Sequence, residues 1–325
     1  MKFMLDLRRK VVYNLNVYSK MKGLKSMART LTTAQIIERS IIKKYRNNIW
    51  NKFVMGIKEY NLICQGDKIA VAVSGGQSSV VMAKCIQHLQ KYSDVKFEVI
   101  YITFDPGFSE DKLNKLSQDF KMMNLNPEIF KSERDIIAEC TKAENICERY
   151  TFAVTDELLK KAKVSGFNKL ALGNNFDDAI EYIFTNMVYN SKVESMLPRL
   201  RRNCCSEIEI IRPMYMVKEE YIKDFQRYNS LNLTSSIYEG TPLSEHTQVK
   251  EMFHQKSEVK ALMERFRNTN ENIENNIFKS IYNVNLRNIV AYNRQGKEYN
   301  FLDNYRLNGT AGTLEETGGE YDIYD

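Results

Sequence analysis

The segment Lys68–Ser79, KIAVAVSGGQSS, constrains the fold of this chain more than any other part. It begins as an apolar, β-branched run typical of a buried strand, passes through Ser74-Gly75-Gly76, and continues into the helical pattern Val80–Ala83. Glycines let the backbone approach a ligand closely, and the N–H groups of a first helical turn attract an anion. The spacing G-x-x-x-x-G-K-S/T of the Walker loop is absent. The segment therefore predicts a phosphate-binding strand–turn–helix unit of another type.

Strand and helix patterns alternate along the central two thirds of the chain. The expected strands are Lys68–Val73, Phe97–Phe104, Glu128–Phe130, Lys169–Gly173 and Ile208–Arg212. The expected helices are Thr32–Tyr60, a helix ending near Tyr92, Ser109–Asn124, Cys147–Ser165, Asp177–Asn190 and Val217–Tyr228. Apolar strands joined by helices indicate an α/β fold, a parallel sheet with helices on both faces. Ligands bind beyond the carboxyl ends of the strands in such sheets.

Composition divides the chain into four regions. We expect a disordered basic extension at 1–31, a nucleotide-binding α/β domain with an N-terminal helix at 32–230, a helical region at 231–306 and a disordered acidic tail at 307–325. The extension has Asp6 as its only acid, which is typical of an RNA-binding arm or a targeting segment. We favour an extension outside the folded domain, or translation that starts at Met27. Further helices are expected at Gln248–Phe266 and Ile273–Val284.

The bulk composition indicates a cytoplasmic protein that does not enter a membrane. No apolar run approaches the roughly 20 residues that cross a bilayer. The six cysteines lack regular spacing, so we expect reduced thiols in the cytosol. A net charge of +6 is compatible with an RNA partner. Whether the chain forms a homodimer stays open.

A second motif follows the expected strand at Lys169–Gly173. Asp177 and Asp178 begin a helix, and Glu181 lies one turn further along the same side. Because this motif and Ser74–Ser79 both follow strands, we expect them at the same edge of the sheet. The three acids are candidate catalytic residues, which would coordinate Mg²⁺ and ATP or place a target base. The alternative is a capping cluster, since acids favour helix N-termini.

The order of these motifs resembles the bacterial tRNA 2-thiocytidine synthetase family. The blocks that carry the resemblance are Ser74–Ser79, Asp105-Pro106-Gly107, the run ALGNNFDDAIE at 171–181, MLPRL at 196–200 and IRPM at 211–214. This family lies in the PP-loop superfamily of ATP pyrophosphatases, with the adenine nucleotide α-hydrolase-like fold. The resemblance implies that ATP binds Ser74, Gly75, Gly76, Gln77, Ser78, Ser79 and Gly173. It also implies adenylation of a cytidine in the tRNA anticodon loop.

Four polar residues of the two motifs depart from the family pattern. Ser78 stands where the family has aspartate, Gln77 where it often has lysine, and Asn174-Asn175 where it often has two basic residues. A carboxylate at the first position can lie near Mg²⁺ and the phosphates, whereas a hydroxyl is a poorer ligand for a hard cation. The anion site made by backbone N–H groups is independent of these side chains. We expect weakened nucleotide binding and strongly reduced adenylation.

The family also implies an iron–sulfur cluster on three cysteines, which this chain does not supply. Cys147 matches the second cysteine of a Cys-x-x-Cys pair, but Glu144 occupies the first position and no cysteine follows Cys205. Three thiolates are needed to leave one iron open. We therefore expect the cluster to be absent, with Cys147 as one remaining ligand. A cluster built from Cys140, Cys147 and Cys204 or Cys205 is the alternative.

Three functions remain open from the sequence. The chain is an active tRNA-modifying sulfurtransferase, a degenerate paralogue that binds nucleotide, tRNA or a partner without turnover, or a nucleotide sensor. The joint loss of the loop acid and two cysteines favours the second. The basic run Arg199–Arg202 is either a tRNA phosphate contact or a solvated loop.

Overall fold

The computed structural model describes residues 31–203, 205–233, 241–270, 272–294 and 296–302. The basic extension up to residue 30 and the acidic tail from 307, both expected from the sequence, lie outside this part. The chain divides into two compact units, residues 1–274 and 275–325. In the described part, no helix is long and apolar enough to span a membrane.

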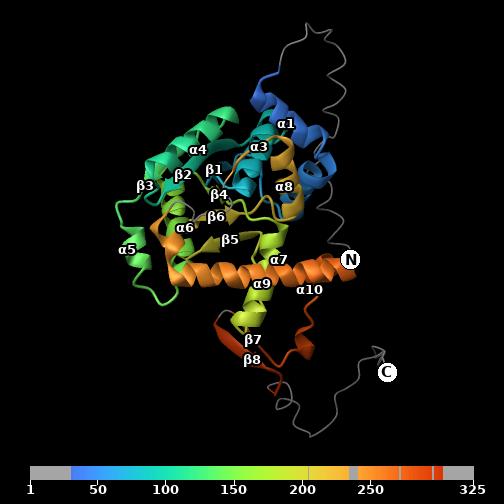
Figure 1. Cartoon of the computed structure of the whole chain (residues 1–325). Helices are drawn as coiled ribbons and strands as arrows, with labels where there is room; N and C mark the ends of the chain where they lie inside the picture. Colours follow the sequence, from blue (N-terminus) through green and yellow to red (C-terminus); the bar gives the residue numbers. More distant parts are fainter. Residues whose placement is uncertain (1–30, 204, 234–240, 271, 295, 303–325) are drawn as a thin grey trace. The chain divides into compact units, whose positions relative to one another are not determined.

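A six-stranded sheet forms the centre of the first unit, with the strand order β3-β2-β1-β4-β6-β5 (Figure 1). Its strands are β1 Lys68–Ala72, β2 Glu98–Asp105, β3 Glu128–Lys131, β4 Lys169–Ala171, β5 Arg199–Arg202 and β6 Cys205–Ile211. All neighbours pair in parallel except β5, which runs antiparallel to β6 at one edge. The predicted α/β fold with a parallel sheet is confirmed.

Helices precede, connect and follow these strands. Their bounds are α1 Thr33–Lys43, the π-helix η3 Arg46–Trp50, α2 Asn51–Glu59, α3 Gln77–Tyr92, α4 Glu110–Met122, α5 Ile136–Cys140, α6 Ile146–Val164, α7 Phe176–Tyr189, α8 Glu219–Tyr228, the 3-10 helix η4 Pro242–Glu245, α9 Thr247–Thr269 and α10 Ile273–Ser280. The single helix expected at Thr32–Tyr60 is interrupted by η3. The second unit contains the 3-10 helix η5 Leu286–Asn288 and a hairpin of β7 Ala291–Arg294 and β8 Lys297–Asn300.

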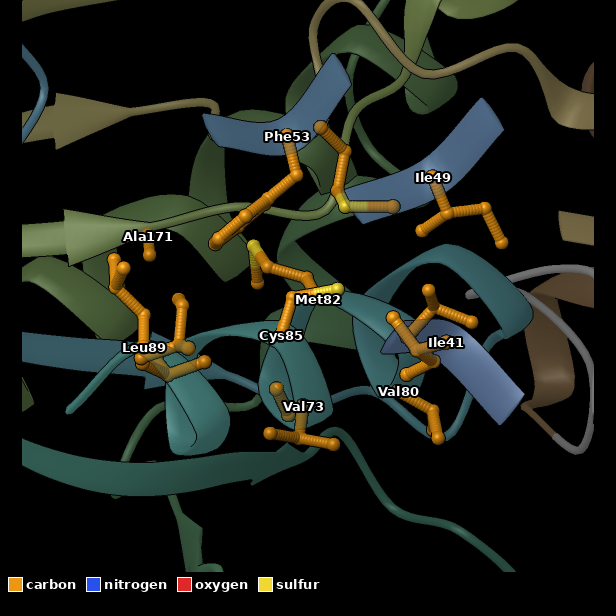
Figure 2. Packing of buried hydrophobic residues seen from close by; sticks show 14 of the residues in the cluster. Ile41, Ile49, Phe53, Val73, Val80, Met82, Cys85, Leu89 and Ala171 are labelled. Atoms are coloured by element: carbon orange, nitrogen blue, oxygen red, sulfur yellow. The ribbon is translucent and has the colours of Figure 1, made fainter. Parts of the chain in front are cut away.

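The alternation of side chains along β1 separates two hydrophobic layers. Ile69, Val71 and Val73 enter a core formed with α1, α2, α3, α4 and α8, whereas Ala70 and Ala72 enter a second core with α5 and α6. Side chains of a strand point alternately to opposite faces, so a strand buried on both faces is apolar throughout. Figure 2 shows the first core, in which residues of the N-terminal helices and of α3 pack together. These layers fix the position of α3, which carries the phosphate loop at its start.

A buried charge network lies at the opposite, amino-terminal end of the sheet. The Nζ of Lys169, the first residue of β4, is 2.8 Å from Asp67 Oδ2 and donates to the Leu62 carbonyl at 2.8 Å. Glu209 of β6 lies 3.5 Å from the same Nζ and 2.7 Å from Arg199 Nε. The basic run at Arg199–Arg202 is therefore strand β5, and Arg199 pairs with a buried carboxylate instead of lying in a solvated loop.

Candidate functional site

The phosphate loop joins the end of β1 to the start of α3. Gly75 has φ of +83°, a conformation that glycine adopts without the strain of a side chain. Gly76 is the N-cap of α3, with φ −72° and ψ 154°, and in the described part of the chain no side chain caps this helix. The sequence Ser-Gly-Gly therefore produces a turn that leaves the first N–H groups of α3 open to a ligand.

The start of α3 differs in this respect from other helices of the unit. Side chains accept hydrogen bonds from first-turn N–H groups in six of them: Thr32 for α1, Ser109 for α4, Asp135 for α5, Asn145 for α6, Asn175 for α7 and His246 for α9. Uncapped N–H groups at a helix start form an anion site with the helix dipole. The geometry of α3 is thus that of a phosphate-binding loop.

Two serine hydroxyls of the loop bind the loop itself. Ser79 Oγ donates to the Gly76 carbonyl at 2.8 Å and lies 3.2 Å from Ser74 Oγ. The Gly76 N–H in turn points to Ser74 Oγ at 3.4 Å. These bonds hold the turn in shape and leave Ser78 as the hydroxyl of the loop that contacts another element.

Gly173 brings the end of β4 against the loop. A Cβ atom at this position would lie 2.8 Å from both the N and the Cα of Ser79, and 3.1 Å from the carbonyl carbon of Ser78. These neighbours are backbone atoms, which cannot rotate away as a side chain does. The predicted proximity of the two motifs is therefore present, and it depends on the absence of a side chain here.

Asn175 connects the second motif to the phosphate loop. Its Nδ2 donates to Ser78 Oγ at 3.0 Å, and the asparagine is only 3% exposed. Its Oδ1 accepts from the Asp178 N–H at 3.0 Å, while its own N–H donates to Asp178 Oδ2 at 2.8 Å. Asp178 thus forms a capping box with Asn175, and burial raises the pKa of its carboxyl.

Asp177 links three helices. Its Oδ2 accepts from the Glu219 N–H at the start of α8 at 2.6 Å, and its Oδ1 is 2.7 Å from Arg267 of α9. Burial raises the pKa of this carboxyl, although the Glu219 N–H and the Arg267 guanidinium act in the opposite direction. Both oxygens of Asp177 are therefore occupied by protein donors.

Glu181 lies one turn further along α7 and pairs with α9, which crosses α7 in Figure 1. Its Oε1 is 3.3 Å from Lys260 Nζ, and its side chain is 12% exposed. Burial raises its pKa to about 7, because desolvation outweighs the attraction of Lys260. The three acids predicted as catalytic are thus close together, and each binds a protein group; their catalytic role stays a prediction.

Substitution of Glu181 by glutamine is expected to change the pH dependence of stability. The folded pKa near 7 exceeds the ordinary value of 4.5, so the folded state binds more protons than the unfolded state between these values. Stability therefore falls as pH rises through this window. At pH 8 we expect Glu181→Gln to be more stable than wild type by roughly 1–3 kcal/mol, with little difference at pH 4.5.

Urea unfolding at several pH values measures this difference. Glu251→Gln, at an exposed position of α9, is the matched control. If the stability of wild type and of Glu181→Gln changes with pH in the same way, the raised pKa does not belong to Glu181.

The cavity beside these acids is too small for a nucleotide. Its volume is about 60 Å³, and Asp177, Glu181, Glu219 and Lys260 are among its lining residues. Sites for drug-sized ligands occupy roughly 300–1,000 Å³. A larger cavity of about 430 Å³ lies beside Lys91 in the last turn of α3, away from the loop.

Two residues at the edge of the sheet that carries the loop were not recognised as site candidates from the sequence. Asp105 is buried at the end of β2, and its Oδ1 accepts from the N–H groups of Gly107 and Phe108 at 2.8 and 2.7 Å. Arg212 follows the last residue of β6, and its Nε donates to Asn174 Oδ1 at 3.2 Å. The strand-end position was visible in the sequence for both residues, but their neighbours were not.

Of the three cysteine positions that the resemblance implies for a cluster, this chain has a cysteine at one, Cys147, and the loss of the cluster stays a prediction. Cys147, in the first turn of α6, donates from Sγ to the Gln248 carbonyl at 3.6 Å, and Cys140 and Cys205 are buried. Within residues that the structure describes, no group of three or more Cys, His, Asp or Glu side chains is arranged to hold a metal. Cys204 lies outside them.

A family model for the PP-loop domain matches residues 42–235, more than half of the chain. The chain belongs to the PP-loop domain family. The matched residues contain the loop, the second motif and the sheet described above.

Curated relatives of this PP-loop chain include tRNA-cytidine(32) 2-sulfurtransferases. The protein of Pseudomonas putida strain W619 is 32% identical over 188 residues, which cover 54% of this chain and 63% of that protein. The chain thus spans less than two thirds of that relative. The protein of Francisella tularensis subsp. tularensis strain WY96-3418 is 27% identical over 257 residues, covering 76% and 90%. These matches confirm the resemblance to 2-thiocytidine synthetases.

A solved structure supports the fold. The U34-tRNA thiolase NcsA from Methanococcus maripaludis, solved with its 4Fe–4S cluster, superimposes with a TM-score of 0.55. The match covers 76% of this chain and 79% of that one at 16% identity. At this identity the likeness shows the fold, which is that of a PP-loop protein.

Proposed function

We propose that this PP-loop protein binds ATP and tRNA, and that its adenylation activity is weakened or lost compared with the sulfurtransferases it resembles. The observation that carries the proposal is the contact between Ser78 and Asn175. A neutral hydroxyl, bound by a neutral amide, stands where the resemblance implies a carboxylate.

Retained nucleotide binding is supported by the backbone of the loop. The positive φ of Gly75 and the uncapped start of α3 form the anion site, and neither depends on residue 78. Gly173 keeps the neighbouring strand end close to this site without filling it. A phosphate bound here would receive hydrogen bonds from N–H groups and the favourable end of the helix dipole.

Weakened adenylation is supported by the carboxylates. In adenylation a substrate oxygen attacks the α-phosphorus and pyrophosphate leaves, so negative charge on the phosphates must be stabilised. A divalent cation commonly does this, held by carboxylate oxygens. Here Ser78 is neutral and Asp178 caps α7. Asp177 and Glu181 form ion pairs with Arg267 and Lys260.

A tRNA partner is supported by the relatives and by charge. The curated relatives are named for a reaction on a tRNA cytidine. The net charge of +6 favours a polyanion, because lysine and arginine supply most nonspecific affinity for nucleic acid. The arginines of β5 contribute less, since Arg199 and Arg202 pair with Glu209 and Asp156.

An active sulfurtransferase is the second candidate, favoured by the match over 90% of the Francisella protein. Anaerobic reconstitution with iron and sulfide tests it. Iron that binds wild type but not Cys147→Ala, followed by 2-thiocytidine in tRNA detected by mass spectrometry, would support this candidate.

Calorimetric titration tests the proposed binding function. We expect ATP to bind with a Kd between about 10 µM and 1 mM, and unmodified tRNA to bind more weakly as salt increases. A folded protein that binds neither ligand would contradict the proposal.

A further inference from the structure

We infer that protein donors complete the phosphate site of this chain, so that a bound phosphate needs no divalent cation. The donors are the hydroxyl of Ser78, the N–H groups at the start of α3 and the guanidinium of Arg212. This inference rests on the proposed nucleotide-binding function and concerns which groups of the same site neutralise the charge of a bound phosphate.

The orientation of the Ser78 hydroxyl follows from Asn175. The Oδ1 of Asn175 accepts from the Asp178 N–H, which fixes which end of the amide is the oxygen. Its Nδ2 is therefore the group that faces Ser78 Oγ, at 3.0 Å. Ser78 accepts from this amide, so its own hydrogen is left to donate to another acceptor. An aspartate at position 78 would accept from Asn175 in the same way but could donate nothing.

Arg212 supplies the positive charge. It is half-buried, Nε donates to Asn174 Oδ1 at 3.2 Å, and Nη1 donates to the Leu197 carbonyl. Both acceptors are neutral, and among the residues described Arg212 forms no ion pair with a carboxylate. By contrast, Arg199 and Arg202 each pair with one.

A partly buried cation without a counter-ion is unfavourable, and desolvation lowers the pKa of Arg212 to about 10. Nearby tyrosine hydroxyls and Asp178 only partly compensate for this desolvation. An anion bound beside Arg212 would supply the missing counter-charge.

The sheet register places this cation at the edge that carries the loop. Ile211 pairs with Ala171, and Ala171 pairs with Val71, so Arg212 lies level with Ala72, the last residue of β1, and Ser74 follows two residues later. Neighbouring strands lie about 4.8 Å apart, so Arg212 is roughly 10 Å from the end of β1. A polyphosphate can span this distance from the start of α3.

The site therefore offers hydrogen-bond donors and a cation to a ligand. The carboxylate at this edge, Asp105, accepts from the Gly107 and Phe108 N–H groups with Oδ1, and its Oδ2 lies 3.5 Å from Lys131 Nζ. Divalent cations such as Mg²⁺ prefer oxygen ligands, mostly carboxylates, whereas bare phosphates prefer N–H, O–H and guanidinium donors. Ser78 with its free hydrogen, the α3 N–H groups and Arg212 match the second set. The acids of α7 are occupied elsewhere.

Titrations of ATP and of inorganic pyrophosphate in EDTA and in Mg²⁺ test the inference on the full chain. We expect the Kd of wild type to change less than about 3-fold between the two conditions. For Ser78→Asp we expect a loss of about 30-fold or more in EDTA, restored in part by Mg²⁺. For Arg212→Gln we expect a loss of about 10-fold or more in both conditions.

Two control substitutions and a folding measurement accompany these titrations. Arg201→Gln changes an exposed arginine of β5 and is expected to leave binding unchanged, and Arg212→Lys is expected to recover part of the affinity. Melting curves identify variants that do not fold.

Wild-type binding that requires Mg²⁺ would overturn the inference and leave the proposed function standing. Absence of ATP and pyrophosphate binding in both conditions would overturn the nucleotide-binding part of the proposed function. If Arg212→Gln weakens tRNA binding but not ATP or pyrophosphate binding, Arg212 does not belong to the nucleotide site and the inference fails.

Discussion

Gly173→Ala is expected to weaken ATP binding by about 100-fold or more, the largest effect on binding of any single change. The added methyl group would lie 2.8 Å from the N and Cα of Ser79, and both atoms belong to the first turn of α3. Relief of this overlap must move backbone, since no side chain can rotate away. Overpacking of this kind typically costs about 1–3 kcal/mol of stability, so the variant should still fold. Titration with ATP measures the loss of binding, and a melting curve measures the stability.

The control for this substitution is Gly56→Ala. Gly56 lies in α2, where a Cβ atom would meet Pro213 O at 3.5 Å and Met216 Cγ at 3.6 Å, both ordinary contacts. We expect ATP binding to be unchanged and stability to rise slightly, because alanine favours helix more than glycine does. If Gly173→Ala binds ATP as well as Gly56→Ala does, the contact of β4 with the loop plays no part in binding.

Lys169→Met is expected to cause the largest loss of stability, about 3–5 kcal/mol. At the amino-terminal end of the sheet, Lys169 Nζ contacts both the carboxylate of Asp67 and the carbonyl of Leu62. Its removal leaves Asp67, which is 7% exposed, with the Cys64 N–H and the Asn168 amide as donors. A buried charge that loses its partner is strongly destabilising. Urea unfolding monitored by circular dichroism measures the change.

A second substitution distinguishes this charge effect from lost packing. In the pair Lys169→Met and Asp67→Asn, no unpaired carboxylate remains at position 67, so the double variant should be more stable than Lys169→Met alone. Equal stability of the single and double variants would mean that the loss comes from packing. A loss below about 1 kcal/mol for Lys169→Met would show that the network is solvated.

The sequence predicted the parts of this protein that depend on short-range pattern. The alternation in β1, the glycines of the loop and the helix that follows are all encoded within Lys68–Ala83, and they have the predicted structure. The position of the second motif at the same edge followed from the topology of parallel sheets. Continuous apolar strands indicated helices on both faces, which the two cores confirm.

The features that escaped prediction depend on partners far away in the chain. Asp177 meets Arg267 and the start of α8, and Glu181 meets Lys260, at separations that periodicity does not reveal. The strand β5 forms because an arginine-rich segment pairs with β6, although such a run resembles a loop. The pKa of Arg212 is lowered by desolvation, which a single sequence does not specify.

ATP–pyrophosphate exchange in the presence of unmodified tRNA is the decisive test of whether this protein has lost adenylation. This assay detects reversible attack on the α-phosphorus, independently of any later sulfur transfer. The account predicts no exchange above background from wild-type protein under conditions in which calorimetry shows bound ATP. Exchange that requires tRNA and disappears in Gly173→Ala would contradict it, and would mean that the loop with Ser78 still adenylates its substrate.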